Sequence, residues 1–144
     1  MRRIQESGQN REPSELDRAG DETDEARVLD LKHLARQCMG DLELEAEVLR
    51  QFRTQAVTLA ATLADDVRLS FAEKADLAHR LRGSALAIGA GPLARVAAAL
   101  ETRARAGAEA RADAPERAVE LSQAVADLRE AVKRAAAEID RLHR

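Results

Sequence analysis

The amino-acid sequence predicts an all-α fold: an antiparallel four-helix bundle with a short N-terminal lid helix. Three observations lead to this prediction. Alanine and leucine, which are strong helix formers, dominate the apolar residues, and aromatic residues make up only 1% of the chain. Apolar residues recur at helical spacing over four long stretches. The connections between these stretches are short, as expected when consecutive helices run antiparallel.

The chain divides into a polar tail and one helical domain. Its 144 residues are enough to bury a core without disulfides. Residues 1–27 are aperiodic, with five basic and eight acidic residues, so we predict a disordered charged tail. Residues 28–144, with 18 residues of each sign, are expected to form the bundle.

The first two helices follow from their boundary residues. A short helix is predicted over residues 31–38, after Asp30, and it is the lid of the bundle. Gly40 ends this helix, and Asp41 is a suitable N-cap for the next one. That second helix is expected over residues 42–64, with its apolar side chains along one face.

The central hairpin has the most specific start and stop signals. Ser70 and Glu73 have the spacing of a capping box, which predicts a helix over residues 70–88. A Gly-Ala-Gly-Pro break follows, and Pro92 suits the first turn of the next helix. We expect that helix to end near Gly107, where a loop over residues 107–114 begins.

The last helix carries a regular apolar seam. Its start is predicted at Asp113-Ala114-Pro115-Glu116, and apolar residues then alternate at spacings of four and three from Leu121 to Leu142. Such a seam could join two copies as a coiled coil. Packing within the chain is the stronger interpretation, because three other amphipathic helices need partners, and we therefore expect a monomer.

His79 stands out because it lies off the apolar stripe of its helix. With about 100° per residue, it points about 200° away from Leu77 and Leu81. Arg82 and Gly83 share its face at the following turn. A glycine inside a helix costs about 0.5–1 kcal/mol relative to alanine, so Gly83 suggests that another molecule must approach the imidazole closely. Arg82 supplies a cation suited to an oxyanion such as phosphate.

The face around His79 is the expected docking surface for another protein. Its predicted members on the same helix are Ala75, Asp76, Arg80 and Leu86. Gln55, on the preceding helix, could flank this surface, although it also fits an ordinary polar helix position.

Glu101 is the predicted partner of the imidazole. His79 lies eleven residues before Ala90, at the centre of the hairpin loop, and Glu101 lies eleven residues after it. In an antiparallel pair the two side chains should lie at the same level. Glu101 could then accept a hydrogen bond from one ring nitrogen and leave the other nucleophilic. A solvated surface glutamate is the alternative.

These residues resemble the histidine-containing phosphotransfer (HPt) domain family of two-component phosphorelays. Residues 79–84, HRLRGS, match the family pattern H-x-[LI]-[KR]-G-[SA]. Residues 89–93, GAGPL, resemble its downstream G-A-x-x-L segment, and Leu100 with Glu101 matches the closing L-E. The resemblance covers residues 28–142, and its specific part is the segment centred on the histidine.

The resemblance implies a function as a phosphocarrier without kinase activity or a nucleotide site of its own. It implies that His79 accepts a phosphoryl group from a receiver-domain aspartate and passes it to another receiver. The partners would be response-regulator receivers and the receiver of a hybrid histidine kinase. No cofactor is expected on this chain, and Mg²⁺ is expected on the partner receiver. The chain has alanine at Ala97, where the family often has cysteine, and this leaves the chemistry intact.

Two alternatives stay open. The chain could be a non-catalytic helical bundle that binds and regulates a receiver or kinase without carrying phosphate. It could also be the phosphoacceptor domain of a larger kinase, although these 144 residues contain no catalytic region.

Other classes of function are disfavoured by composition. Balanced charge and few aromatic residues argue against nucleic-acid binding. His33, His143 and Cys38 are too dispersed to make a metal site with His79, so no metal is expected. The sequence has neither an apolar signal region nor a stretch long enough to span a membrane, and we expect a cytoplasmic protein that does not engage membranes.

Overall fold

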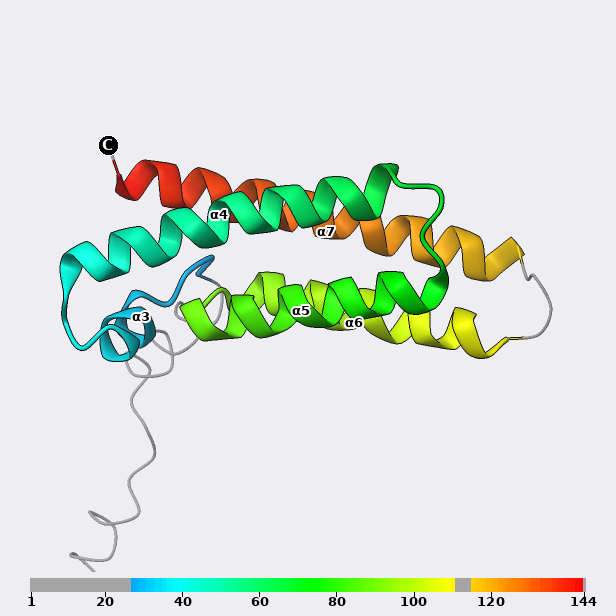
Figure 1. The fold of residues 1–144 in the computed structure, drawn as a ribbon, viewed down its shortest axis with the longest axis horizontal. Helices are drawn as coiled ribbons and strands as arrows, with labels where there is room; N and C mark the ends of the chain where they lie inside the picture. Colours follow the sequence, from blue (N-terminus) through cyan, green and yellow to red (C-terminus); the bar gives the residue numbers. More distant parts are fainter. Residues whose placement is uncertain (1–26, 111–114, 144) are drawn as a thin grey trace, which may run out of the picture.

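The computed structural model describes residues 27–110 and 115–143 and contains five helices within them (Figure 1). They are α3 (Leu31–Gln37), α4 (Leu42–Asp65), α5 (Phe71–Ile88), α6 (Gly91–Glu109) and α7 (Pro115–Leu142). The described ranges contain no strand. The all-α prediction is therefore confirmed.

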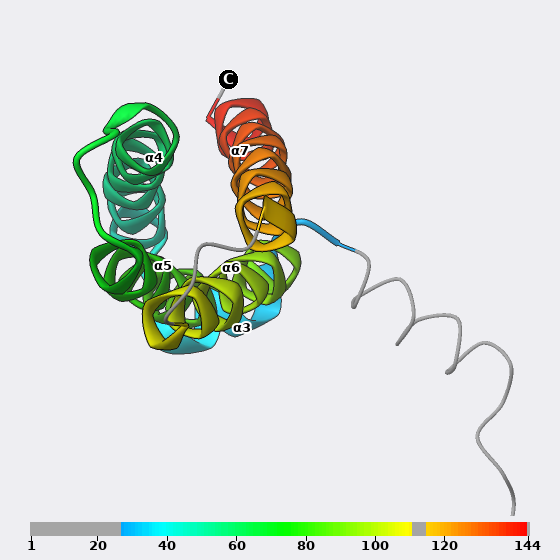
Figure 2. The same cartoon turned by 90° about the vertical axis from the view of Figure 1, so that its right-hand side faces the viewer.

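The four long helices form a closed bundle. Seen from its end, α4, α5, α6 and α7 surround a common centre in chain order (Figure 2). Each of these helices packs against two others, and the contact between α5 and α6 is the most extensive. The predicted four-helix bundle is present, and its central hairpin is also its most tightly joined pair.

Local signals explain where α5 and α6 begin and end. The Ser70 hydroxyl accepts a hydrogen bond from the Glu73 amide, and the Glu73 carboxylate accepts one from the Ser70 amide, which completes the predicted capping box. Gly89 ends α5 in the left-handed conformation, with φ of 83°. Pro92 lies in the first turn of α6, where its missing N–H costs nothing.

The short helix α3 lies beside the turn between α5 and α6 (Figure 1). The Asp30 amide donates to the Gly89 carbonyl at 2.8 Å, and the His33 Nε2 donates to the Ala87 carbonyl at 3.1 Å. His33 is therefore half-buried and bonded to α5. These contacts attach the chain before α4 to the hairpin.

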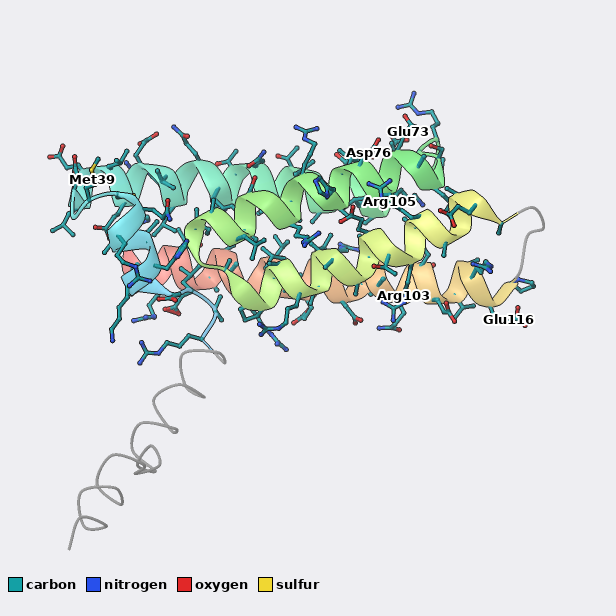
Figure 3. All side chains as sticks on the ribbon, turned by 90° about the horizontal axis from the view of Figure 1, so that it is seen from below. Met39, Glu73, Asp76, Arg103, Arg105 and Glu116 are labelled. Carbon is teal, nitrogen blue, oxygen red and sulfur yellow. The ribbon has the colours of Figure 1, made fainter. Side chains whose placement is uncertain are left out.

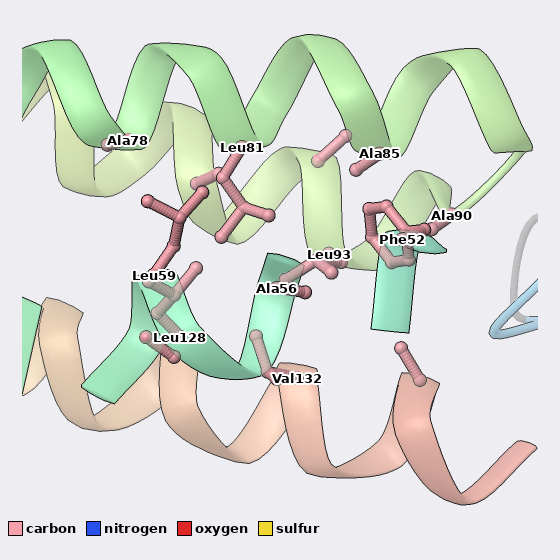
Figure 4. Packing of buried hydrophobic residues seen from close by; sticks show 14 of the residues in the cluster. Phe52, Ala56, Leu59, Ala78, Leu81, Ala85, Ala90, Leu93, Leu128 and Val132 are labelled. Atoms are coloured by element: carbon pink, nitrogen blue, oxygen red, sulfur yellow. The ribbon is translucent and has the colours of Figure 1, made fainter. Parts of the chain in front are cut away.

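The core consists of leucines separated by many alanines (Figure 4). The largest fully buried side chains are Leu34, Leu81, Leu93, Leu100, Leu128 and Ile139. Ala78 and Ala85 on α5 and Ala97 on α6 have no exposed surface, so each of these helices buries side chains that end at Cβ. Small buried residues permit neighbouring helices to approach closely, in keeping with the extensive contact between α5 and α6.

The helix α6 ends two residues after the predicted position near Gly107, so the start of the predicted loop at residue 107 is wrong. The helix continues to Glu109, and Gly107 is buried within it. A Cβ at this position would lie 3.1 Å from ring atoms of Phe71. Gly107 is therefore a contact site for the Phe71 ring, which packs against the core from the start of α5. Only the end of the predicted loop, residues 111–114, lies outside the described residues.

The apolar seam of α7 packs within the chain. Leu121, Leu128, Val132 and Ile139 are buried, and α7 contacts both α4 and α6. This confirms the interpretation of the seam as intrachain packing. In the predicted tail, residues 1–26 lie outside the described residues. None of the helices within the described ranges has the length and apolarity to cross a membrane.

Candidate functional site

His79 lies in the middle of α5 with 63% of its side chain exposed. The buried stripe of α5 is formed by Ala75, Ala78, Leu81, Ala85 and Ile88. His79 falls outside this stripe, as the sequence predicts. The buried face of α5 thus packs in the core, while the imidazole of His79 projects into solvent.

Glu101 lies opposite His79 on α6, at the level expected for the antiparallel hairpin. His79 Nδ1 is 3.0 Å from Glu101 Oε2. Because an ionised carboxylate only accepts hydrogen bonds, Nδ1 must carry the proton that it donates. In the neutral ring Nε2 then has an unprotonated lone pair, which is the nucleophilic form.

The carboxylate of Glu101 is held in the charged form by its neighbours. Only 13% of its side chain is exposed, and this burial alone would raise its pKa. The hydrogen bond from Arg105 and the contact with His79 outweigh burial and lower the pKa of Glu101 below its usual value. Glu101 therefore stays an acceptor for Nδ1 throughout the neutral range.

Two arginines approach the same carboxylate. Arg82 Nη1 is 3.6 Å from Glu101 Oε1, whereas Arg105 Nη2 is 3.0 Å from Glu101 Oε2. Arg82 was expected near an incoming oxyanion, and in the structure it also neighbours Glu101. Sequence reasoning missed Arg105, although its position four residues after Glu101 on one helix is a recognised ion-pair spacing. The site is thus an imidazole beside one anion and two cations.

Gly83 is exposed one helical turn after His79. Neither the backbone conformation nor the packing of α5 requires a glycine at this position. A Cβ built there would meet nothing within 4 Å. Neither a positive φ nor close packing within the described residues explains it. The role of Gly83 in giving a partner access to the imidazole therefore stays a prediction.

Most of the expected docking residues are exposed around the site. Asp76, Arg80 and Leu86 all lie on the surface of α5, with Leu86 51% exposed. Gln55 is exposed on α4 and lines, with Arg80, a groove of about 560 Å³ between α4 and α5. The structure therefore brings Gln55 to the same side of the molecule as Arg80.

The expected exposure of Ala75 is wrong. Ala75 has no exposed surface and belongs to the hydrophobic core. The buried stripe of α5 runs through Ala75, Ala78, Leu81 and Ala85, whereas Leu77 is only partly buried, so the stripe is displaced from Leu77 toward the alanines. Ala75 lies at the edge of this stripe, and its side chain, which ends at Cβ, is covered. The longer imidazole of His79 extends past this edge into solvent. Ala75 is therefore not a surface residue for docking.

No group of three or more potential metal ligands occurs within residues 27–110 and 115–143. His33 is bonded to α5, and Cys38 is buried beside α3 and α4. Burial raises the pKa of the Cys38 thiol, and the nearby Glu45 and Asp41 add to this.

Comparisons with known proteins match this chain to a family. Comparison with curated proteins and with solved structures gave no match. The family model described as "Hpt domain" matches residues 47–138, which include most of α4, all of α5 and α6, and most of α7. The match covers more than half of the chain and includes His79 and Glu101. The chain therefore belongs to the Hpt domain family, which has a phosphotransfer role in two-component signalling and interacts with response-regulator receiver domains.

Proposed function

We propose that this protein is a phosphorelay intermediate that carries a phosphoryl group on His79. It accepts the group from a receiver-domain aspartyl phosphate, such as that of a hybrid histidine kinase, and passes it to the receiver of a response regulator. The observation that supports this best is the contact between His79 Nδ1 and Glu101 Oε2 at 3.0 Å, beside an imidazole that is 63% exposed. In this proposal Nδ1 orients the ring through its bond to Glu101, and Nε2 is the nucleophile.

The transfer step follows from the assignment of the two ring nitrogens. The Nε2 lone pair attacks the phosphorus in line, the Nε2–P bond forms, and the P–O bond to the aspartate breaks with its electrons going to the carboxylate. The proton on Nδ1 stays in place, so the phosphorylated ring becomes positively charged. The carboxylate of Glu101 stabilises this developing charge, much as a buried aspartate does in a catalytic triad. In the reverse step the ring leaves as a neutral imidazole.

Arg82 and Gly83 have complementary parts in this proposal. Arg82 is 44% exposed and one helical turn from His79, so its guanidinium can reach an oxygen of the phosphoryl group. Gly83 leaves room for the backbone of the receiver beside the imidazole. Transfer between two protein groups depends mainly on positioning and charge stabilisation, which these residues provide from this side. Mg²⁺ would be supplied by the partner receiver.

Docking would use the exposed residues around His79. Asp76, Arg80 and Leu86 offer both charges and an apolar contact within one face of α5. Gln55 and the groove between α4 and α5 extend this face beyond the helix. A rim of mixed charge around a small apolar contact suits a transient partner, for which fast association and release matter more than affinity.

The direct test is transfer of radiolabelled phosphate from a phosphorylated receiver of the same genome. Wild type should become labelled with an acid-labile, base-stable phosphate, and His79→Gln should not. His143→Gln is the matched control, because His143 is an exposed histidine at the end of the chain, and it should be labelled as wild type is. Label on His79→Gln would overturn the assignment. Receiver binding without any label on wild type would instead support a binding protein that carries no phosphate.

A further inference from the structure

Arg105 contacts both the partner of the histidine and the docking face. Its Nη2 and Nε lie 3.0 Å and 3.3 Å from Glu101 Oε2, the oxygen that also accepts from His79 Nδ1. The same Nη2 lies 3.5 Å from Asp76 Oδ1 on α5. Figure 3 shows Arg105 and Asp76 approaching each other from α6 and α5. The guanidinium is thus held between two carboxylates from different helices.

Glu101 needs such a partner to be a reliable acceptor. A glutamate side chain has several rotatable bonds, and ordering it costs entropy that one exposed imidazole contact would have to offset. Arg82 is the other cation near it, and at 3.6 Å it lies beyond ordinary hydrogen-bond distance. The two bonds from Arg105 therefore add to the contact with His79 in restraining Oε2. A planar guanidinium binding through two nitrogens restrains orientation better than a single donor does.

We propose that Arg105 is a positioning residue that aims Glu101 Oε2 at His79 Nδ1 and so selects the imidazole form with a free Nε2. This inference deepens the proposed function and rests on it. Arg105 acts through Glu101 and does not need to touch the phosphorus. The contact of the same Nη2 with Asp76 on α5 adds a second, longer-range attraction to the guanidinium.

The other charged groups around the site leave this role to Arg105. On α5, Arg82 faces the other oxygen of Glu101, and Arg80 lines the groove toward α4. On α4, Glu47 and Arg50 lie in that groove and pair with each other. On α6, Arg103 bonds the Ala99 carbonyl of its own helix, and Figure 3 shows it directed away from α5.

The test compares Arg105→Met with Arg103→Met. Methionine keeps an unbranched stem and has a helix propensity close to that of arginine, so neither change should disturb α6. The imidazole nitrogens are followed by ¹⁵N NMR, which distinguishes a ring protonated on Nδ1 from one protonated on Nε2. Wild type and Arg103→Met should show His79 mainly as the Nδ1–H form. Arg105→Met should show a larger share of the Nε2–H form and a phosphotransfer rate lower by about tenfold, because the nucleophilic nitrogen is less often in the reactive form and orientation.

A further variant distinguishes a positioning role of Arg105 from a general effect of its substitution on the fold. Arg105→Lys keeps a cation that can donate to Oε2 and should restore part of the Nδ1–H population and of the rate. The Glu101 carboxylate, followed by ¹³C NMR, should show a raised pKa in Arg105→Met and not in Arg103→Met. An unchanged tautomer ratio in Arg105→Met would overturn the proposal, even if transfer slowed, because Arg105 would then act on the phosphoryl group itself.

The tautomer measurement needs no receiver and no phosphate. The tautomer ratio could therefore be unchanged in Arg105→Met while wild type is still labelled on His79. That result would reject the role of Arg105 and leave the proposed function standing. Conversely, an altered tautomer ratio in Arg105→Met together with an unlabelled wild type would leave the positioning geometry in place and remove the phosphorelay assignment.

Discussion

Gly83 provides the sharpest test of the access argument, because stability and function should respond to its substitution in opposite directions. An alanine at this position would add a Cβ with nothing within 4 Å, so it would neither clash nor gain buried contacts. The change in the free energy of unfolding then reduces to helix propensity. Gly83→Ala and Gly83→Leu should each be more stable than wild type by about 0.5–1 kcal/mol.

This gain is measurable by thermal unfolding followed with circular dichroism. For a domain of this size it corresponds to a Tm higher by roughly 2–6 °C. The added side chain of leucine would occupy the open space one turn from His79. Since a displacement of about 1 Å from the reactive geometry can cost a hundredfold in rate, Gly83→Leu should slow phosphotransfer by at least about tenfold. Gly83→Ala, with one added carbon, should have a smaller effect.

Two results would refute this reasoning. Transfer by Gly83→Leu at the wild-type rate would show that the glycine has no part in access. A Gly83→Ala variant less stable than wild type would show that α5 needs the glycine for its own packing.

Three further predictions concern the bundle around the site. Gly107→Ala should destabilise the protein by up to about 2 kcal/mol in urea unfolding, because the new Cβ would lie 3.1 Å from the Phe71 ring and the overpacking cost exceeds the gain in helix propensity; unchanged or higher stability would show that the ring moves freely. Ser70→Ala should cost about 1 kcal/mol by removing half of the capping box while leaving the rate of transfer unchanged, and a loss of transfer would contradict its purely structural role. Glu101 has a lowered pKa, so its ionisation stabilises the fold above the ordinary glutamate pKa of about 4.3, and this contribution is lost as pH falls through the lowered value. Glu101→Gln should therefore lose less stability than wild type on acidification below about pH 4 in unfolding curves, and parallel pH dependence would argue against the contact.

Features set by local sequence were predictable. Ser70 and Glu73 form a capping box from residues three apart, so the start of α5 needs no knowledge of the remaining fold. The level of Glu101 relative to His79 follows from an antiparallel hairpin and equal distances along the chain. Four amphipathic stretches with short connections were likewise sufficient for the bundle.

Features set by the distance between helices were not predictable. Ala75 is buried because the stripe of α5 that faces the core includes Ala75 and Ala78 beside Leu81, while Leu77 lies at its edge and is only partly buried. Gly107 marks no helix end because the Phe71 ring occupies the space where its side chain would lie. The position of Arg105 between Glu101 and Asp76 depends on side-chain conformations across two helices, which spacing along one helix does not specify.

The central claim is that His79 carries the phosphoryl group on Nε2 while Nδ1 stays bonded to Glu101. The most direct measurement is ³¹P and ¹⁵N NMR of the protein after transfer from a phosphorylated receiver. One phosphorus signal coupled to Nε2 of His79, with the proton retained on Nδ1, is the predicted result. Phosphate on Nδ1, or on a residue other than His79, would contradict the account.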